Sequence, residues 1–228
     1  LFSLLKEQFN FLPWWDWPKE FRSKDKIKLD LWSEENFSKL LEKKLIQWHL
    51  NRQWLEVKDF AIMRGVKLVG DIPFYVSRDS VDVWSNKSLF SITEKGELLF
   101  QSGVPPDYFS STGQLWGTPV YEWNEHIKTQ FTWWKERFNR QFQLVDILRL
   151  DHFRALESYW MVNGDSKNAI KGEWIKSPGI ELLNSLKDYL NVDALPIIAE
   201  DLGVMTEAVN NLRDAFDLPG MKILQFAF

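Results

Sequence analysis

Three short apolar segments of the sequence each end in a carboxylate, and helical patterns separate them. The segments are Val66–Asp71, Val145–Asp151 and Pro196–Glu200. Strands that alternate with helices predict a parallel sheet with right-handed crossovers. Because successive side chains of a strand point to opposite faces, Arg149 and Asp151 share one face. Ile198 and Glu200 share one face of the third segment in the same way.

The order of the segments predicts the α/β class, as a partial (β/α)₈ TIM barrel with long insertions after its strands. With a further strand expected at Met221–Phe226, we count four strands, whereas a closed barrel of this type has eight. We therefore expect residues 1–228 to be part of a single catalytic barrel domain. Leu1 and the apolar run that ends at Phe228 suggest that both ends are cut from a longer chain.

The remaining segments are assigned from periodicity and breakers. Residues 1–32 are expected to be irregular, and a helix capped by Ser33 should run to about Arg64 and stop at Gly65. Further helices are expected over 126–143, 180–190 and 204–215. Residues 77–125 form a long insertion that carries a candidate substrate-binding loop, and residues 157–179 form a second, irregular insertion. Six tryptophans before Gly65 are assigned to core packing: Trp14, Trp15, Trp17, Trp32, Trp48 and Trp54.

Composition excludes several classes of protein. The net charge is −4 and no run of Lys or Arg is present, which argues against nucleic acid as a partner. No apolar stretch approaches the roughly 20 residues of a membrane span, and no signal peptide pattern opens the chain. The lack of Cys suits a cytoplasmic enzyme. A metal site is not expected, because His49, His126 and His152 are widely spaced.

The carboxylates carry the chemical signal. If the strands share one barrel, Asp71, Asp151 and Glu200 meet at its C-terminal mouth, where barrel active sites lie. Two converging carboxylates are the minimum for cleaving a glycosidic bond, and a separation near 5 Å would mean retention of configuration. Asp71 alone is equally well explained as a helix cap.

The two later carboxylates have different neighbours. The guanidinium of Arg149 should favour the ionised form of Asp151, as a nucleophile requires. The apolar residues around Glu200 should favour the neutral form, as a general acid requires. The alternative for Arg149 and Asp151 is a structural ion pair in a polar barrel interior.

The run Gly103–Pro119 contains adjacent prolines, two further glycines and three aromatic residues close together, Tyr108, Phe109 and Trp116. Such a stiffened aromatic loop above a carboxylate mouth is able to bind sugar rings. A packed loop with buried aromatic side chains is the alternative.

The chain resembles the amylomaltase family, the 4-α-glucanotransferases also called disproportionating enzymes. The matching runs are Gly70–Val76, Asp79–Trp84, Gly103–Pro119, Arg149–Arg154, Ala199–Gly203 and Leu218–Phe228. Residues 1–65 are similar more loosely, through Trp14–Pro18 and the helix before Gly65.

The resemblance implies a (β/α)₈ barrel that acts on α-1,4-glucans and maltooligosaccharides by a retaining double displacement, with no cofactor. It implies that Asp151 is the nucleophile and Glu200 the general acid/base. The implied binding residues are Arg149 beside Asp151, Asp71 and His152 at the innermost sugar subsite, Tyr108, Phe109 and Trp116 in the arching loop, and Phe226 in the cleft wall.

The family's third catalytic Asp, in a Thr-His-Asp-Asn type run, has no counterpart here because the chain stops first. We therefore expect the parent protein to be active and these 228 residues alone to be inactive. Two other functions stay open: a retaining hydrolase of the wider α-amylase group, and a non-catalytic carbohydrate-binding protein.

Overall fold

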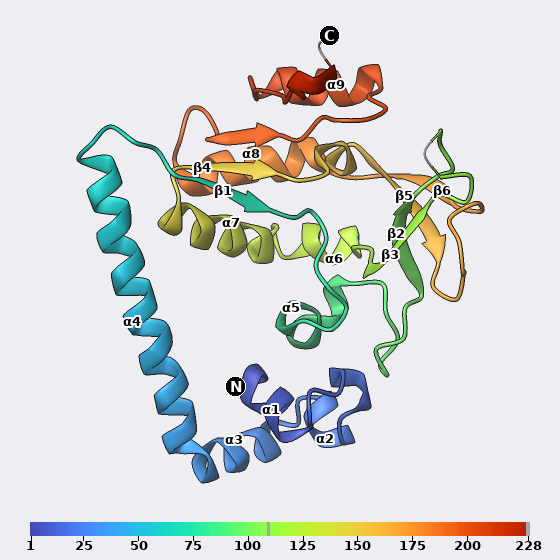
Figure 1. Cartoon of the computed structure of the whole chain (residues 1–228). Helices are drawn as coiled ribbons and strands as arrows, with labels where there is room; N and C mark the ends of the chain where they lie inside the picture. Colours follow the sequence, from blue (N-terminus) through green and yellow to red (C-terminus); the bar gives the residue numbers. More distant parts are fainter. Residues whose placement is uncertain (109, 227–228) are drawn as a thin grey trace.

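The computed structural model describes residues 1–108 and 110–226, the last of them without its side chain. Its centre is a parallel sheet of β1 (Val69–Ile72), β4 (Ile147–Leu150) and β7 (Ile197–Ala199), in the order β1-β4-β7. Helix α7 (Thr132–Leu144) packs against β1 and β4, and α8 (Gly179–Leu190) packs against α7 (Figure 1). The predicted parallel α/β arrangement is confirmed, as an incomplete barrel.

The two faces of the parallel sheet differ in burial as the alternation of side chains predicts. Leu148 and Leu150 of β4 are fully buried, whereas Arg149 between them is half-buried. In the register of the sheet Arg149 pairs with Asp71 of β1 on one side and with Ile198 of β7 on the other. These three residues therefore form one row on the face opposite the buried leucines.

A second, antiparallel sheet arises from the two insertions. Its strands are β2 (Phe100–Val104), β3 (Gln114–Pro119), β5 (Ser158–Asn163) and β6 (Glu173–Lys176), in the order β3-β2-β5-β6. The expectation that residues 157–179 are irregular is wrong, because β5 pairs with β2 and β6. A strand whose partner lies some 60 residues away gives little local signal. Residues 77–125 also contain α5 (Val81–Ser85) and α6 (Trp123–Lys128).

The first 35 residues contain three short α-helices joined by turns, which corrects the expectation of an irregular segment. The helices are α1 (Phe2–Gln8), α2 (Lys19–Arg22) and α3 (Lys26–Glu35). Short helices of this kind are stabilised by tertiary packing, here by the buried rings of Trp14, Trp17 and Trp32. Ser33 is not an N-cap. It lies inside α3, and Asp25 caps that helix by accepting a hydrogen bond from the Lys28 amide.

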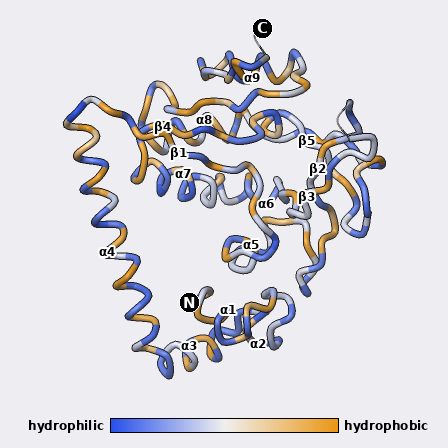
Figure 2. The backbone as a smooth tube through the Cα atoms, in the orientation of Figure 1, coloured by the Kyte–Doolittle hydropathy of each residue, from blue (hydrophilic) through white to orange (hydrophobic). Residues whose placement is uncertain are grey.

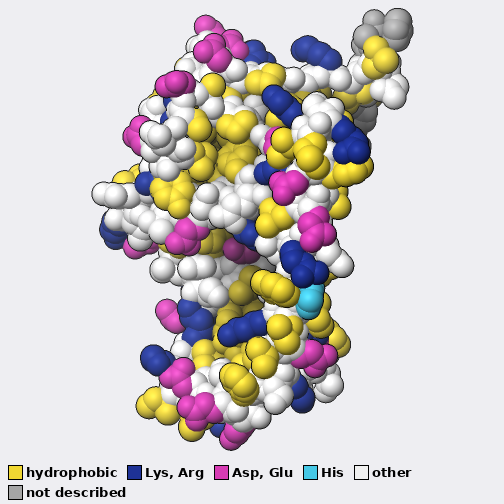
Figure 3. Space-filling view, turned by 90° about the vertical axis from the view of Figure 1, so that its left-hand side faces the viewer, with side chains coloured by type: hydrophobic (Ala, Val, Ile, Leu, Met, Phe, Trp, Pro, Cys, Tyr) yellow, Lys and Arg dark blue, Asp and Glu magenta, His cyan; other side chains and the backbone are white. Residues whose placement is uncertain are grey.

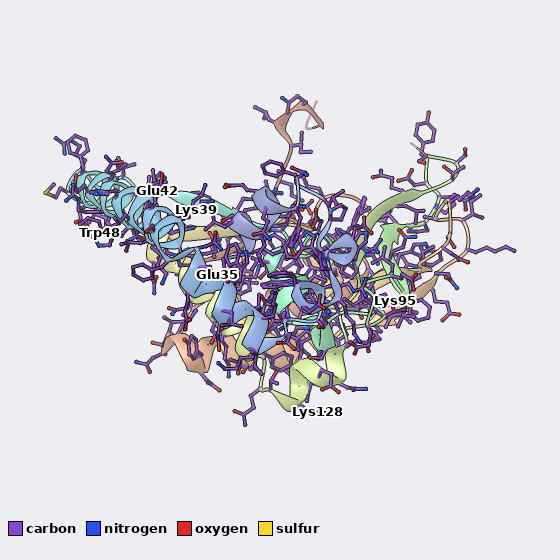
Figure 4. The ribbon with its side chains drawn as sticks, turned by 90° about the horizontal axis from the view of Figure 1, so that it is seen from below. Glu35, Lys39, Glu42, Trp48, Lys95 and Lys128 are labelled. Atoms are coloured by element: carbon purple, nitrogen blue, oxygen red, sulfur yellow. The ribbon has the colours of Figure 1, made fainter. Side chains whose placement is uncertain are left out.

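Helix α4 (Phe37–Ile62) stands beside the rest of the chain as an arm (Figures 1 and 4). All of it is described, and none of its side chains is buried. Core packing is therefore wrong for Trp48 and Trp54, which are 55% and 41% exposed. Hydrophobic and hydrophilic residues alternate along α4 (Figure 2). Apolar side chains are exposed on this side of the molecule (Figure 3). In the described part of the chain no helix is long and apolar enough to cross a membrane.

Helix α4 is attached near its end. The Trp54 indole donates to the Leu144 carbonyl at 2.7 Å, and the Lys58 ammonium donates to the carbonyls of Phe142, Gln143 and Val145. The predicted stop is confirmed, because Gly65 has a φ of +69° just after the helix.

The helix expected over 126–143 is two helices, α6 and α7, because Gln130 and Phe131 adopt left-handed backbone angles between them. The helices expected over 180–190 and 204–215 are confirmed as α8 and α9 (Glu207–Ala215). The strand expected at Met221–Phe226 is wrong, since Leu224–Phe226 forms a 3₁₀ turn. Beside β7 the chain accepts one ladder bond, from the Ala199 amide to the Pro219 carbonyl. The Met221 amide, which would return the next bond of a parallel ladder, donates instead to the Asp201 carboxylate.

His126 gives the fold a measurable acid sensitivity. It is fully buried against Tyr121 and Trp133, and its Nε2 lies 3.1 Å from the Leu89 carbonyl. Burial lowers the pKa of His126 to about 4, against about 6.5 in an unfolded chain. The unfolded state therefore binds more protons between these values, and stability is lost as the pH falls from about 6.5 towards 4.

We predict that His126→Gln reduces the loss of unfolding free energy between pH 7 and pH 5 by about 2 kcal/mol relative to the unsubstituted chain. Urea denaturation at the two pH values measures the difference. His49→Gln, on the exposed arm α4, is the control and should leave the pH dependence unchanged. Equal acid sensitivity in all three chains would contradict the prediction.

Candidate functional site

The guanidinium of Arg149 connects two carboxylates at the C-terminal edge of the parallel sheet. Its Nε lies 2.8 Å from Oδ1 of Asp71, and its Nη2 lies 3.1 Å from Oδ2 of the same residue. Its Nη1 lies 2.9 Å from Oδ1 of Asp151. A planar fork with five donors can hold two carboxylates in fixed positions in this way. The predicted contact between Arg149 and Asp151 is present, and Asp71 shares it.

Glu200 follows β7, the neighbour of the strand that precedes Asp151. Its main-chain amide donates to the Leu150 carbonyl of β4 at 3.0 Å. Its side chain accepts two further main-chain hydrogen bonds, from His152 to Oε2 at 2.9 Å and from Leu202 to Oε1 at 3.0 Å. The apolar residues next to Glu200 in the sequence therefore describe its surroundings incompletely, since two peptide N–H groups face the carboxylate.

His152 lies between the two candidate catalytic residues and has a left-handed backbone, with φ of 53° and ψ of 47°. Its ring packs edge-on against Trp116, with 4.9 Å between centroids, and lies 6.2 Å from the ring of Tyr75. Burial, and then the charge of Arg154, lower the pKa of His152 to about 4. Its Nε2 is buried, and no hydrogen-bond partner for it occurs within residues 1–108 and 110–226.

Six of the sequence-predicted site residues fall into two connected groups. Asp71, Arg149 and Asp151 form the ion-paired group, and Glu200, His152 and Trp116 form the second group beside it. Tyr108 is 97% exposed on the loop between β2 and β3. Phe109 and the side chain of Phe226 lie outside the described residues. Within the described residues no cluster of three or more His, Asp or Glu side chains could hold a metal ion.

The loop between β2 and β3 is built as a narrow hairpin. Gly113 has a φ of +67°, and a Cβ there would lie 2.3 Å from the Val104 carbonyl oxygen. A Cβ on Gly103 would lie 2.3 Å from the Gln114 carbonyl oxygen of the facing strand. Only glycine fits such approaches, which explains two of the glycines in the predicted loop. The same hairpin places Trp116 of β3 over His152.

Sequence reasoning missed the part that Tyr75 and Leu202 take in this site. Tyr75 is 8% exposed, and its ring contacts Trp116 and His152. Leu202 takes part only through its peptide N–H. A main-chain donor carries no residue-type signal, and the aromatic contact joins segments far apart in the chain.

Comparison with known proteins agrees with this geometry. A family model described as 4-alpha-glucanotransferase matches residues 1–228. The chain belongs to the 4-alpha-glucanotransferase family.

Family members of known structure and sequence extend well beyond this chain. A 4-alpha-glucanotransferase of Synechocystis sp. is 46% identical over the whole chain, which covers 45% of that relative, and one of Clostridium butyricum is 42% identical and 47% covered. The amylomaltase of Streptococcus agalactiae, solved in complex with acarbose, superposes with a TM-score of 0.94 at 36% identity, over 100% of this chain and 46% of its own. The chain thus spans just under half the length of these relatives.

In this member of the 4-alpha-glucanotransferase family, Asp201 follows Glu200 but has a structural role. Its side chain is 4% exposed, and Oδ2 lies 2.5 Å from Nη1 of Arg213 on α9. Its Oδ1 accepts the Met221 amide at 2.7 Å. Burial acts to raise the pKa of Asp201, but the bonds from Met221 and Arg213 outweigh it and lower the pKa. Asp201 thus fixes the turn after β7 to α9, as expected for a structural carboxylate.

Asp214 offers a matched comparison, because it pairs with the same Arg213 at 2.7 Å but is 64% exposed. We predict that Asp201→Ala costs about 2–3 kcal/mol of unfolding free energy, because the Met221 amide and the half-buried Arg213 guanidinium lose the acceptor that they share. Asp214→Ala should cost less than about 0.5 kcal/mol. Urea denaturation of both variants tests this, and equal losses would contradict the structural role of Asp201.

Proposed function

We propose that the protein to which this chain belongs is a 4-α-glucanotransferase that moves α-1,4-glucan segments between maltooligosaccharides. One observation carries the proposal. Asp151 and Glu200 follow adjacent parallel strands, β4 and β7, and the residue after Asp151 donates a hydrogen bond to Glu200. Two carboxylates at one sheet edge match the requirement of glycosidic bond cleavage, and the family relationship supports transfer in preference to hydrolysis.

In the proposed first step a carboxylate oxygen of Asp151 attacks the anomeric carbon of the donor sugar, and the bond to the glycosidic oxygen breaks. Glu200 gives its proton to that oxygen, so the leaving chain departs as an alcohol. In the second step Glu200 takes the proton of an acceptor 4-hydroxyl, which displaces Asp151. The two inversions restore the starting configuration. Arg149 keeps Asp151 oriented in this scheme.

The binding residues proposed are Asp71 and His152 at the innermost subsite, Trp116 of β3 with Tyr108 and Phe109 of the loop before it, and Phe226 at the cleft wall. The contacts of Asp71 with Arg149 and of Trp116 with His152 support the first part of this assignment. The acarbose complex of the Streptococcus agalactiae relative is consistent with a sugar-binding cleft. A cytoplasmic location is proposed from the Cys-free composition alone.

We also propose that the 228 residues do not catalyse transfer by themselves. Their parallel sheet has three strands, whereas a closed barrel has eight. On the face that carries Asp71 and Arg149, Val69 of β1 is 58% exposed. Water therefore reaches the face that a barrel interior would enclose, and a glycosyl-enzyme there is not shielded from hydrolysis.

A chimera tests the proposal. The chain replaces the matching segment of the Synechocystis relative, and the product is incubated with maltotriose. We expect glucose together with chains longer than maltotriose, and we expect none from the 228-residue chain alone. Asp151→Asn and Glu200→Gln should each lower the rate by at least about a thousandfold, whereas Asp214→Asn, at an exposed position of α9, should not lower it.

The other outcomes decide against the proposal. Accumulation of shorter sugars only would indicate a hydrolase. A folded chimera that binds acarbose without turnover of maltotriose, or that keeps its rate after Asp151→Asn, would contradict the assignment of the catalytic pair.

A further inference from the structure

The peptide groups of three consecutive residues after β4 are fixed to two different strands. The Asp151 amide donates to the Ile72 carbonyl of β1 at 3.0 Å. The Phe153 amide donates to the Glu200 carbonyl at 3.2 Å. Between them, the His152 amide donates to the Glu200 carboxylate at 2.9 Å. The chain thus turns from β1 to β7 within three residues, and the turn occurs at His152.

The left-handed backbone of His152 makes this turn possible. Such angles disfavour residues with a Cβ, and they persist in a folded protein only where the surroundings impose them. Here the surroundings are aromatic: the His152 ring lies against Trp116 and Tyr75. Because Nε2 of the ring has no hydrogen-bond partner in the described residues, packing fixes the ring.

We propose that His152 is a positioning residue for Glu200. Its left-handed backbone directs the peptide N–H at Oε2 of Glu200, and the packing of its ring against Trp116 and Tyr75 maintains that backbone. The inference rests on the proposed function, because it assigns Glu200 the acid/base role. It is distinct from any contact of the imidazole with a sugar, since the group that acts is the main-chain amide.

Three substitutions at one position separate the backbone from the imidazole. His152→Asn, His152→Gly and His152→Ala all lose the ring. Asn and Gly accept left-handed angles readily, whereas Ala does not. In the chimera described above we expect the Asn and Gly variants to agree in kcat within about threefold. The Ala variant should be slower by about tenfold, which corresponds to the cost of a left-handed residue with a Cβ.

The pH dependence of kcat/KM adds a readout that loss of a sugar contact does not move. Its basic limb reports the general acid of the free enzyme. The pH midpoint of that limb should be unchanged in the His152→Asn and His152→Gly variants. It should shift by about half a pH unit or more in the His152→Ala variant. If the three variants share one kcat and one pH profile, the inference is wrong and His152 acts through its side chain alone.

Tyr75 supplies an independent pair of variants, which decides the matter if the Ala variant does not fold. Tyr75→Phe keeps the ring against His152 and should leave the pH profile unchanged. Tyr75→Leu removes it and should move the profile in the same direction as His152→Ala. Equal profiles for the two Tyr75 variants would overturn the inference. An unsubstituted chimera without transfer activity would instead overturn the proposed function.

Discussion

Arg149 lies in the middle strand of the parallel sheet, β4. Its guanidinium contacts two carboxylates, that of Asp71 in β1 and that of Asp151 directly after β4. The contact with Asp71 joins β4 to β1, and the contact with Asp151 fixes the first residue after β4. Both depend on the sheet register, which sets Asp71 beside Arg149. A slip of one residue in β4 would place Arg149 on the buried face and its two leucines on the exposed face. The chemistry proposed for the site therefore depends on the pairing of β1 with β4.

The second carboxylate is held by different means. Glu200 receives two peptide N–H groups, and one of them comes from the turn directly after Asp151. The antiparallel sheet contributes through Trp116, whose ring packs on His152. The insertions thus form a sheet of their own that reaches the turn between the two carboxylates.

Prediction from sequence succeeded where the signal was local and failed where the partner was distant. The three parallel strands, the stop at Gly65 and helix α8 all follow from periodicity and breakers near each segment. The strand β5 was missed because it pairs with β2 of the other insertion, and β6 was missed with it because β6 pairs with β5 alone. The expected burial of Trp48 was wrong. An apolar stripe predicts which face of a helix can pack against another element, but it does not show that the fold places an element there.

The sequence by itself determined which face of each parallel strand carries Asp71, Arg149 and Asp151, since alternation of side chains is a property of any extended chain. It also determined the family, through motifs that span the chain. Only the tertiary structure decided what each carboxylate touches. The guanidinium of Arg149 contacts Asp71 and Asp151, and the amide of His152 donates to Glu200. The ring of Tyr75 packs against His152. These contacts join residues from separate elements. The register of the parallel sheet and the packing of the second sheet against it fix these distances, and both are properties of the whole fold.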